Sequence, residues 1–524
     1  MERPCAWKKY DDEQLSELEG LAERYRSFIS DNKTERECVE TAVELARAAG
    51  YRDLAEAVAA GDAVKPGDKL YVNTRGKAVT LFNVGRAPIS EGLNILGAHV
   101  DSPRLDVKQN PVYEKGELAF LDTHYYGGLK TSLWVATPLA IHGVIAKKDG
   151  SVVPVVIGED PSDPVFCISD ILIHLAGEQM KKTHAEAVDA EALDVIVGGK
   201  PVRLGAAQSD EGDAKPESGD KDTEKDPVKR LFLDLLAERF GIEEEDLLSA
   251  ELEVVPAGPA REMGLDRSMI LGYGQDDRVC AYTSLEAMLA VTDVERTAAC
   301  LLVDKEEIGS VGATGMQALY FENALAELME LAGEGGGLAL RRALANSRML
   351  SSDVSAGFDP AYVGQFEEKN AAFLGRGLCF NKYTGSRGKG GSNDADAEYV
   401  ALLRDIMDEA NVSFQTCELG RVNAGGGGTI AYIMARYGMD VIDSGVAVLS
   451  MHSLWEATDK ADVYEDYCGY VAFLQHVLLQ LVRRRHRAHV TYPVRETAGA
   501  RSARPSRSLS TCGLFPDMPS RRPV

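Results

Sequence analysis

Apolar residues along the chain follow two periods, one typical of helices and one typical of strands. Leu18, Leu21 and Tyr25 recur at helical spacing, and residues 11–50 are predicted to be helical. Further helices are predicted at 228–240, 279–291, 316–331, 429–437 and 462–482. Short apolar runs predict a hairpin at 70–84 and strands at 93–98, 140–146, 152–157, 267–273, 300–303, 349–352 and 446–451. This mixture predicts an α/β protein.

The pattern changes within the chain, which indicates an inserted domain. Residues 105–262 are rich in alternating, strand-like stretches, whereas residues 1–104 and 263–482 mix strands with helices. Within the insertion, residues 208–227 are charged and poor in apolar side chains, so a disordered loop is predicted there. Residues 483–524 carry ten arginines against two acidic residues and no periodicity, which predicts a basic disordered tail.

Length, charge and cysteine content narrow the class of protein. A chain of 524 residues exceeds the usual size of one core. A net charge of -25 argues against nucleic acid and anionic membrane surfaces as partners. The N-terminus has no apolar signal segment, and no apolar run reaches membrane-spanning length, so a cytoplasmic location is expected. The nine cysteines lack CxxC spacing, which indicates reduced thiols.

Polar side chains with metal-binding chemistry follow the predicted strands. Each signal alone has an ordinary explanation, such as a surface loop, a helix cap or a solvated acidic pair. Five of them nevertheless share one arrangement, an apolar strand that ends in a histidine or a carboxylate: His99, Asp276, Glu307, Asp353 and His452. Two histidines and three carboxylates can hold two divalent ions if one carboxylate bridges them. Zinc suits these donors, with cobalt or manganese as alternatives.

The neighbours of these residues predict hydrolysis. Glu306 precedes Glu307 in the run CLLVDKEEIGS and is predicted to be the general base that takes a proton from a metal-activated water. Asp101, two residues after His99, is predicted to orient the imidazole. The sequence contains no GxSxG motif or other signature of a nucleophilic side chain, so a reaction without a covalent intermediate is expected.

Five motifs in order, GAHVDSP, QDDR, VDKEEIGS, SSDVSAGFDP and SMHSLWE, carry a resemblance over about residues 10–482. The chain resembles the aspartyl aminopeptidase (aminopeptidase I) family of di-zinc metallopeptidases, in particular its bacterial branch. The resemblance implies an α/β catalytic domain interrupted by a β-rich dimerisation domain, and dimers that assemble into a tetrahedral dodecamer. It also implies hydrolysis of the N-terminal peptide bond of peptides that have a free N-terminus.

Carried over residue by residue, the resemblance implies a role for each site position. Asp276 would bridge two ions, and Glu306 and Asp101 would keep the roles given above. The resemblance further implies the terminal ligands His99 and Asp353 or His452, the additional ligand Glu307, the pocket lysine Lys382, and His174, which would reach a neighbouring subunit's active site from the inserted domain.

Two departures from the family pattern concern specificity. Ala356 stands where aspartyl-specific members resemble each other in having a histidine, and the loop around Lys389 replaces a more aromatic sequence. Both acidic and neutral N-terminal residues, such as leucine, therefore stay open as substrates.

Two other functions also stay open at this point. A related two-metal amidohydrolase, such as a deacylase, would share the ligands, and a panel of free peptides against N-acylated amino acids separates it from a peptidase. A metal-holding scaffold without turnover is the second alternative. Glu306 argues against a scaffold, which has no need for a base.

Overall fold

The structure of the protein, a computed structural model, describes residues 3–202 and 225–487. Most of the predicted disordered loop (208–224) and most of the predicted tail (488–524) lie outside the described residues. The inner ends of both segments are helical instead, since one helix begins at Pro227 and another continues to Arg487. By internal contacts the chain divides into Met1–Gln480 and Leu481–Val524, and the sheets and the site described below lie in the first unit.

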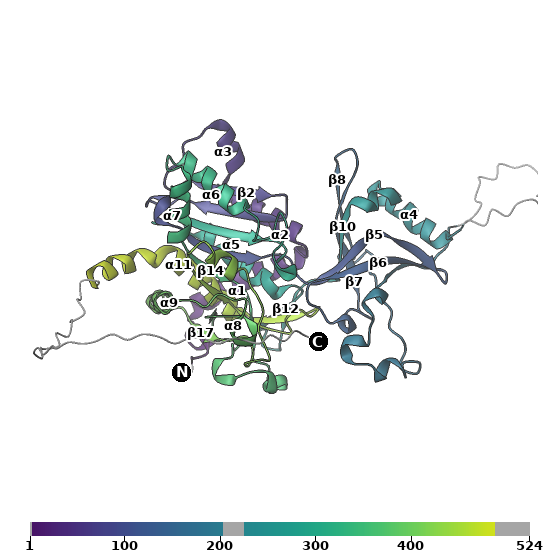
Figure 1. The fold of residues 1–524 in the computed structure, drawn as a ribbon. Coiled ribbons are helices and arrows are strands. Elements are labelled where there is room, and N and C mark those ends of the chain that lie inside the picture. The colour runs from purple at the N-terminus through teal and green to yellow at the C-terminus, as the bar shows by residue number, and fades with distance from the viewer. Residues whose placement is uncertain (1–2, 203–224, 488–524) are drawn as a thin grey trace, which may run out of the picture. The chain divides into compact units, whose positions relative to one another are not determined.

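The strands form three sheets, which confirms the predicted α/β class with mixed sheets (Figure 1). The nine-stranded sheet has the order β1 (Arg52–Asp53), β2 (Lys69–Thr74), β3 (Ala78–Asn83), β13 (Ala298–Val303), β4 (Asn94–His99), β14 (Arg348–Ser352), β18 (Asp440–Gly445), β16 (Leu378–Asn381) and β17 (Phe414–Cys417). The six-stranded sheet has the order β8 (Val152–Ile157), β7 (Leu139–Ala146), β10 (Ala250–Pro256), β5 (Arg104–Lys115), β6 (Leu118–Tyr126) and β9 (Val195–Gly198). The five-stranded sheet has the order β11 (Arg261–Met263), β12 (Met269–Gly272), β20 (Glu456–Asp459), β19 (Ala447–Leu449) and β15 (Ser355–Ala356).

The helices lie between these strands along the chain. They are α1 (Asp12–Asp31), α2 (Glu35–Ala48), α3 (Leu54–Ala60), α4 (Pro227–Phe240), α5 (Gln275–Ala290), α6 (Tyr320–Leu331), α7 (Gly337–Asn346), α8 (Ser386–Lys389), α9 (Ala397–Glu409), α10 (Ala431–Ala435) and α11 (Lys460–Arg487). Among the described helices, none combines the length and the apolarity that crossing a bilayer requires. The eight cysteines that the structure describes are free thiols.

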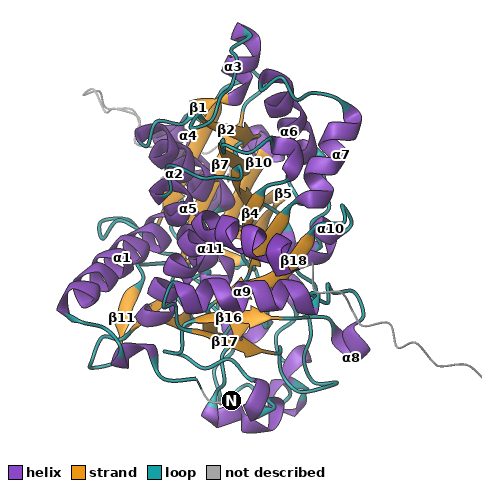
Figure 2. Ribbon diagram, turned by 90° about the vertical axis from the view of Figure 1, so that its left-hand side faces the viewer, coloured by secondary structure: helices purple, strands orange, loops and turns teal. Residues whose placement is uncertain are grey.

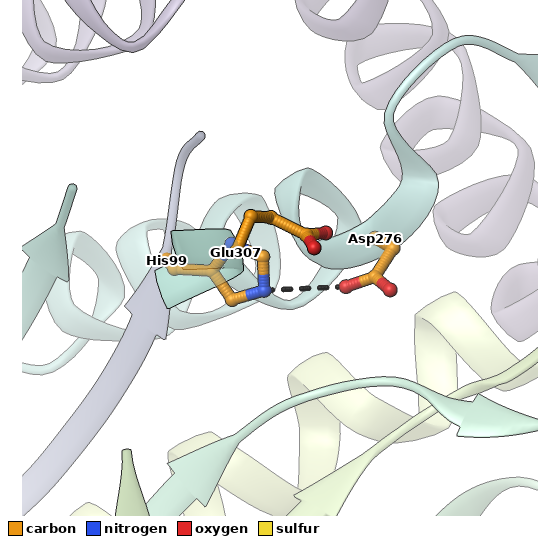
Figure 3. Close-up of side chains that lie close together, drawn as sticks. All are labelled: His99, Asp276 and Glu307. Carbon is orange, nitrogen blue, oxygen red and sulfur yellow. Dashed lines mark ion pairs between the residues drawn. The ribbon is translucent and has the colours of Figure 1, made fainter. Parts of the chain in front are cut away.

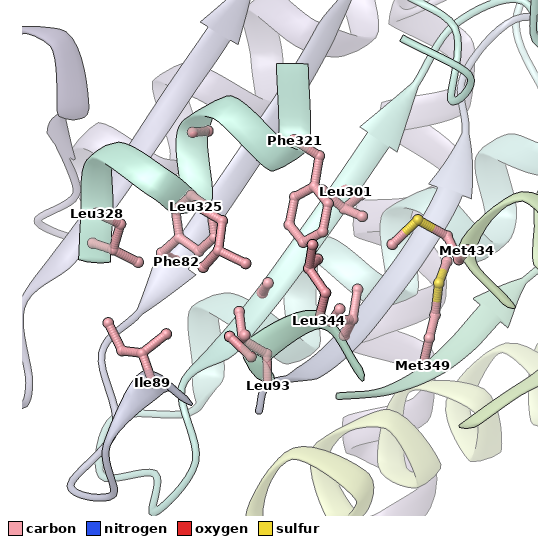
Figure 4. Packing of buried hydrophobic residues seen from close by; sticks show 14 of the residues in the cluster. Phe82, Ile89, Leu93, Leu301, Phe321, Leu325, Leu328, Leu344, Met349 and Met434 are labelled. Carbon is pink, nitrogen blue, oxygen red and sulfur yellow. The ribbon is translucent and has the colours of Figure 1, made fainter. Parts of the chain in front are cut away.

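Helices cover both faces of the nine-stranded sheet because successive strand residues point to opposite sides. Leu301 of β13 packs with Phe82, Phe321 and Leu344 in the core under α6 and α7 (Figure 4). On the other face α5 packs against β4 and β13. Figure 2 shows α11 and α9 lying across this sheet, and the Tyr470 hydroxyl of α11 donates to the Ser444 carbonyl of β18 at 2.9 Å. Burial on both faces explains why the strands read as continuous apolar runs.

Several predicted boundaries are wrong, among them three between residues 316 and 451. The strand predicted at 446–451 is only β19, Ala447–Leu449, and it is preceded by β18, which the pattern did not predict. The helix predicted at 429–437 is only α10, Ala431–Ala435. The helix predicted from 316 begins at Tyr320, because Gly315 approaches Ser310 too closely for a side chain, and the loop folds back on itself before α6.

All strands of the six-stranded sheet come from residues 104–256, which apart from Arg104 lie in the stretch predicted to be an inserted domain. The bounds of that domain, 105–262, stay a prediction. The insertion meets the start of α2 through several polar groups. Four of them, buried or half-buried, form what we call the α2 junction cluster: Lys33, Glu37, His142 and Glu159.

The α2 junction cluster is internally paired. Glu37 closes a capping box with Thr34 at the start of α2 and accepts from His142 Nδ1 at 2.8 Å. The other ring nitrogen of His142 lies 3.1 Å from Glu159 Oε1, which also pairs with Lys33 Nζ at 2.6 Å. Lys33 Nζ donates in addition to the carbonyls of Pro256 and Gly258. Two carboxylates therefore face one lysine and one histidine.

Candidate metal centre

Three neighbouring parallel strands of the nine-stranded sheet deliver four of the predicted site residues. β4 lies between β13 and β14 and is parallel to both, with Val303 of β13 opposite His99 of β4. The carboxyl ends of parallel strands meet at one edge, so the residues there are brought together. They are His99 at the end of β4, Glu306 and Glu307 after β13, and Asp353 after β14.

The five-stranded sheet delivers the other two residues. Asp276 follows β12 at the start of α5, where its backbone is not yet helical, and its peptide bond to Asp277 is cis. His452 lies in the turn between β19 and β20. All six predicted residues line one cavity of about 500 Å³, whose other lining residues include Asn381, Thr384 and the glycines 426–428. The structure therefore brings together five predicted metal ligands and the predicted base.

Asp276 lies between the two histidines. Its Oδ1 is 3.2 Å from His99 Nε2, and its Oδ2 is 3.1 Å from His452 Nε2. Figure 3 shows His99 and Asp276 facing each other, with the carboxylate of Glu307 beside them. Glu307 Oε1 is 3.4 Å from His452 Nε2, and Glu306 Oε2 is 4.0 Å from His99 Nε2. One carboxylate thus contacts both imidazoles, which is the position of a bridging ligand.

Two overlapping sets of side chains have their ligand atoms within 4.8 Å of one another. The first set is His99, Asp276 and Glu307, and the second is His99, Asp277 and Asp353. Imidazole nitrogens with carboxylate oxygens suit zinc and, less selectively, other first-row divalent ions. The donor set of this cavity therefore fits the predicted metal.

Acidic groups outnumber basic groups at this site. Burial raises the pKa of Glu306 to about 7 although the charge of His99 opposes the shift. Burial and the charge of Asp276 raise the pKa of Glu307, and burial and the charge of Asp277 raise that of Asp353. Among the described residues that line the cavity there is no lysine or arginine. Apart from the two histidines, the described cavity wall therefore offers these carboxyl groups no cation from the chain itself.

Both histidines are polarised toward their carboxylate neighbours. Burial lowers the pKa of His99, but its hydrogen bonds to Asp101 and Asp276 outweigh this and raise it. For His452, burial is likewise outweighed by the contact with Asp276, and the pKa rises to about 10. The surrounding carboxylates therefore favour a positive charge at each imidazole, which a proton supplies and which a bound cation could supply in its place.

Asp101 supports the site from behind. It is fully buried, its backbone carbonyl lies 2.9 Å from His99 Nδ1, and its carboxylate lies 3.4 Å from the same nitrogen. Its two oxygens accept hydrogen bonds of 3.1 Å from the backbone amides of Glu306 and Glu307. Asp101 therefore contacts His99 through its backbone carbonyl, and its carboxylate holds the turn that carries both glutamates.

Two residues at the site were not predicted. Glu456 is buried and accepts from the backbone amides of His452, at 2.6 Å, and Asp276, at 3.2 Å, so it ties together the two segments that carry these ligands. Its place in the quoted motif SMHSLWE, four residues after His452, was the available signal. Asp277 accepts from the backbone amide of His99 at 3.3 Å, and the adjacent pair QDDR gave no way to tell its role from that of Asp276.

The two predicted substrate-binding residues do not line this cavity within the described part of the chain. His174 is exposed in the segment between β8 and β9. Lys382 pairs with Asp394, and its neighbours Asn381 and Thr384 contribute to the cavity wall. Their predicted roles stay predictions.

An α/β chain whose strand ends gather two histidines and several carboxylates in one cavity has the fold and donor set of a metal-dependent hydrolase. A family profile described as Aminopeptidase I zinc metalloprotease (M18) matches residues 28–474. The chain belongs to this M18 family of zinc metalloaminopeptidases.

Similar proteins cover nearly the whole chain. The probable M18 family aminopeptidase 1 of Clostridium acetobutylicum is 54% identical over 471 residues, 90% of this chain and 98% of the relative. Its counterpart in Thermotoga maritima is 41% identical over 476 residues, 91% of this chain and 99% of the relative.

Solved structures of M18 aminopeptidases are similar to this chain over nearly its whole length. Aminopeptidase I from C. acetobutylicum has a TM-score of 0.80 at 52% identity, and the M18 aminopeptidase from T. maritima has 0.83 at 41%, each covering 91% of this chain and 100% of its own. The S. cerevisiae mApe1 dodecamer has a TM-score of 0.69 at 21% identity, covers 88% of this chain and 97% of its own, and bears on the fold alone.

These comparisons confirm the predicted family, fold and activity. The protein is a metalloaminopeptidase, a hydrolase that acts on peptide bonds. The deacylase and the scaffold without turnover are therefore set aside.

Proposed function

We propose that the enzyme releases N-terminal residues from peptides at a pair of divalent ions, with Asp276 as the ligand common to both. The position of Asp276 carries this proposal, because its two oxygens lie 3.2 Å and 3.1 Å from two different histidines. His99 and Asp353 would complete one ion's ligands, and His452 and Glu307 the other's. Zinc suits this donor set best, with cobalt and manganese as the alternatives.

The reaction would be hydrolysis without a covalent intermediate. When bound, paired divalent ions polarise the peptide carbonyl and lower the pKa of an attacking water. The carboxylate of Glu306 accepts the proton of that water and delivers it to the leaving amine. Asp101 holds the backbone amides of Glu306 and Glu307, so the base and the adjacent ligand keep a fixed separation.

Replacing the base tests the mechanism. Glu306→Gln should retain both ions and lose about 10²–10⁴-fold in kcat, because the amide cannot accept the proton. The exposed Glu56→Gln is the matched control and should behave as the wild type. Near-native turnover of Glu306→Gln, measured with metal content on the same sample, would remove Glu306 from its role.

The preference at the N-terminal residue would be for neutral side chains. Lys382 and Lys389, the cations near the cavity wall, both pair with Asp394, so neither is left to bind an acidic side chain. Ala356 likewise offers no charge or hydrogen bond. A panel of aminoacyl reporters should give a higher kcat/KM for leucine than for aspartate, and the reverse order would contradict this specificity.

The inserted region, residues 105–262, would form the contact between subunits of a homo-oligomer, with dimers assembling into a dodecamer. Large apolar side chains are exposed around His174, which supports coverage by a second copy of the chain: Ile171, Leu172, Ile173, Leu175 and Met180. Isolated exposed apolar residues are common, but a run of this kind marks an interaction site. Ile173→Glu should reduce the assembly size measured by light scattering, and an unchanged mass would contradict this contact.

His174 would act across that contact. His174→Ala should lower activity without changing metal content, since the side chain is exposed in its own chain and would complete a neighbouring subunit's site. Identical kinetics in the variant and the wild type would refute the cross-subunit role.

A further inference from the structure

The last residue of β6 and the two glycines that follow it lie beside both halves of the candidate metal centre. We propose that the segment Tyr126–Gly128 is a positioning element for the two metal-binding histidines, so that the six-stranded sheet sets the metal affinity of its own subunit. The inference rests on the ligand set proposed above and adds residues that are not ligands themselves.

Tyr126 acts on the His99 side. Its side chain is 7% exposed, and its hydroxyl donates to Asp101 Oδ2 at 2.8 Å. Burial and the charge of Asp101 raise the pKa of Tyr126, so the hydroxyl stays protonated and remains a donor. The Arg104 guanidinium lies 3.9 Å above the tyrosine ring and fixes its position. The hydroxyl thus holds Asp101, which contacts His99 and accepts from the backbone amides of both glutamates.

Gly128 acts on the His452 side. Its carbonyl accepts from His452 Nδ1 at 2.7 Å, which leaves Nε2 to face Asp276 and Glu307. A histidine ligand commonly binds its ion through one nitrogen while a carbonyl or a carboxylate holds the other. A β-carbon on Gly128 would lie 3.3 Å from that same Nδ1, so the absence of a side chain allows this approach.

Gly127 completes the segment between these two contacts. Its φ is 73°, in the left-handed region that favours glycine, and a β-carbon there would lie 3.3 Å from Glu307 Oε2. The segment therefore contacts Asp101 through Tyr126 and His452 through Gly128, and Gly127 leaves little room for a side chain beside Glu307. Simple packing of the end of β6 would need only apolar contact, whereas this segment donates a hydrogen bond to Asp101, which lies beside His99, and accepts one from His452.

The inference is tested by measuring how tightly the full-length protein, first stripped of metal, binds Zn²⁺. Zn²⁺ is titrated in competition with a chromophoric chelator into wild type, Tyr126→Phe and Gly128→Ala. Tyr126→Phe keeps the ring under Arg104 and removes one donor, and it should raise a Zn²⁺ dissociation constant about 10-fold or more. Gly128→Ala displaces His452 and should raise a dissociation constant by a similar factor. In the metal-loaded enzyme both variants should lower kcat more than they raise KM.

Tyr113→Phe is the matched control. It removes a tyrosine hydroxyl that donates to Asp194 from strand β5 of the same sheet, without any contact to the metal ligands. The inference is overturned if Tyr126→Phe and Gly128→Ala bind Zn²⁺ as the wild type does, or if Tyr113→Phe weakens binding equally. A wild type that binds no Zn²⁺ would instead remove the proposed ligand set, and with it this inference, so the two failures can be told apart.

Discussion

The metal centre and the α2 junction cluster both bury histidine among carboxylates, but only the junction adds a lysine to its histidine. In the junction, burial opposes ionisation of Glu37 and Glu159, yet hydrogen bonds from His142 outweigh it and lower both pKa values. At the metal centre, the two histidines lower the pKa of Asp276 in the same way, but burial raises the pKa of Glu306, Glu307 and Asp353.

The contrast shows which feature marks a metal site. Buried carboxylates with histidines occur in both places, so residue type alone does not distinguish them. The junction supplies Lys33, whereas the described cavity wall at the metal centre contains neither lysine nor arginine. A deficit of positive charge from the chain, combined with strand ends that converge, therefore points to an external cation.

Removal of the metal should have the largest effect on this comparison. Dialysis against a strong chelator should lower kcat at least about 10³-fold, because no lysine or arginine of the described cavity wall replaces the ions in polarising the substrate. The apparent Tm should also fall, since ions bind only the folded state and contribute about 4 kcal/mol at a thousandfold excess over Kd. Added Zn²⁺ should restore both. Turnover by a preparation shown to be metal-free would contradict the charge-deficit interpretation.

Removal of Lys33 from the α2 junction cluster should have the second-largest effect. Lys33→Met should destabilise the metal-free protein by about 3–5 kcal/mol in urea denaturation, because it breaks a buried ion pair, leaves Glu159 with His142 as its remaining cation in the cluster, and removes the donor of the Pro256 and Gly258 carbonyls. Its metal content should remain that of the wild type. The double variant Lys33→Met/Glu159→Gln is the control and should recover part of the loss. If Lys33→Met lost its metal but kept its stability, the α2 junction cluster and the metal centre would not be independent.

The junction should also respond to pH with a defined sign. The pKa of His142 is raised above its ordinary value of 6.5, because contacts with Glu159 and Glu37 outweigh its burial. Its contribution to stability is therefore fully present below pH 6.5 and is lost as pH rises through the folded-state pKa. The stability difference between wild type and His142→Gln should shrink across that interval. A difference that grows with pH would contradict the assigned protonation.

An exposed ion pair should show the smallest effect. Arg86 contacts Asp293 at 2.6 Å and Glu295 at 2.9 Å, but its side chain is 54% exposed. Arg86→Ala should change the free energy of unfolding by no more than about 1 kcal/mol. A loss of stability as large as that of Lys33→Met would mean that burial does not determine how much each ion pair contributes to the free energy of unfolding.

The strand-end pattern predicted the site because sheet geometry turns local sequence into spatial position. His99, Glu307 and Asp353 each follow an apolar run, and the parallel register of β4, β13 and β14 brings those ends together. The mixed α/β class and the paired helices at 11–50 followed from the two hydrophobic periods in the same way.

The parts that sequence did not predict depend on contacts between distant segments. Glu456 accepts from the backbone amides of His452, four positions before it, and of Asp276, 180 positions before it, so its contacts depend on the tertiary fold. Tyr126 reads as an ordinary strand residue until its partner Asp101 is known. Likewise, β18 was missed because its polar Asp443 and Ser444 are buried by tertiary contacts that no local period reveals.

The register of β13 limits how the length of this chain can change. Val303 lies opposite His99, and one residue added between Ala298 and Val303 would advance the following glutamates by about 3.3 Å and turn them to the other face. The exposed turn at residues 148–150, between β7 and β8, carries no such constraint. Insertions, deletions or added tags should therefore be tolerated at that turn, whereas in β13 they should displace the glutamates and disrupt the site.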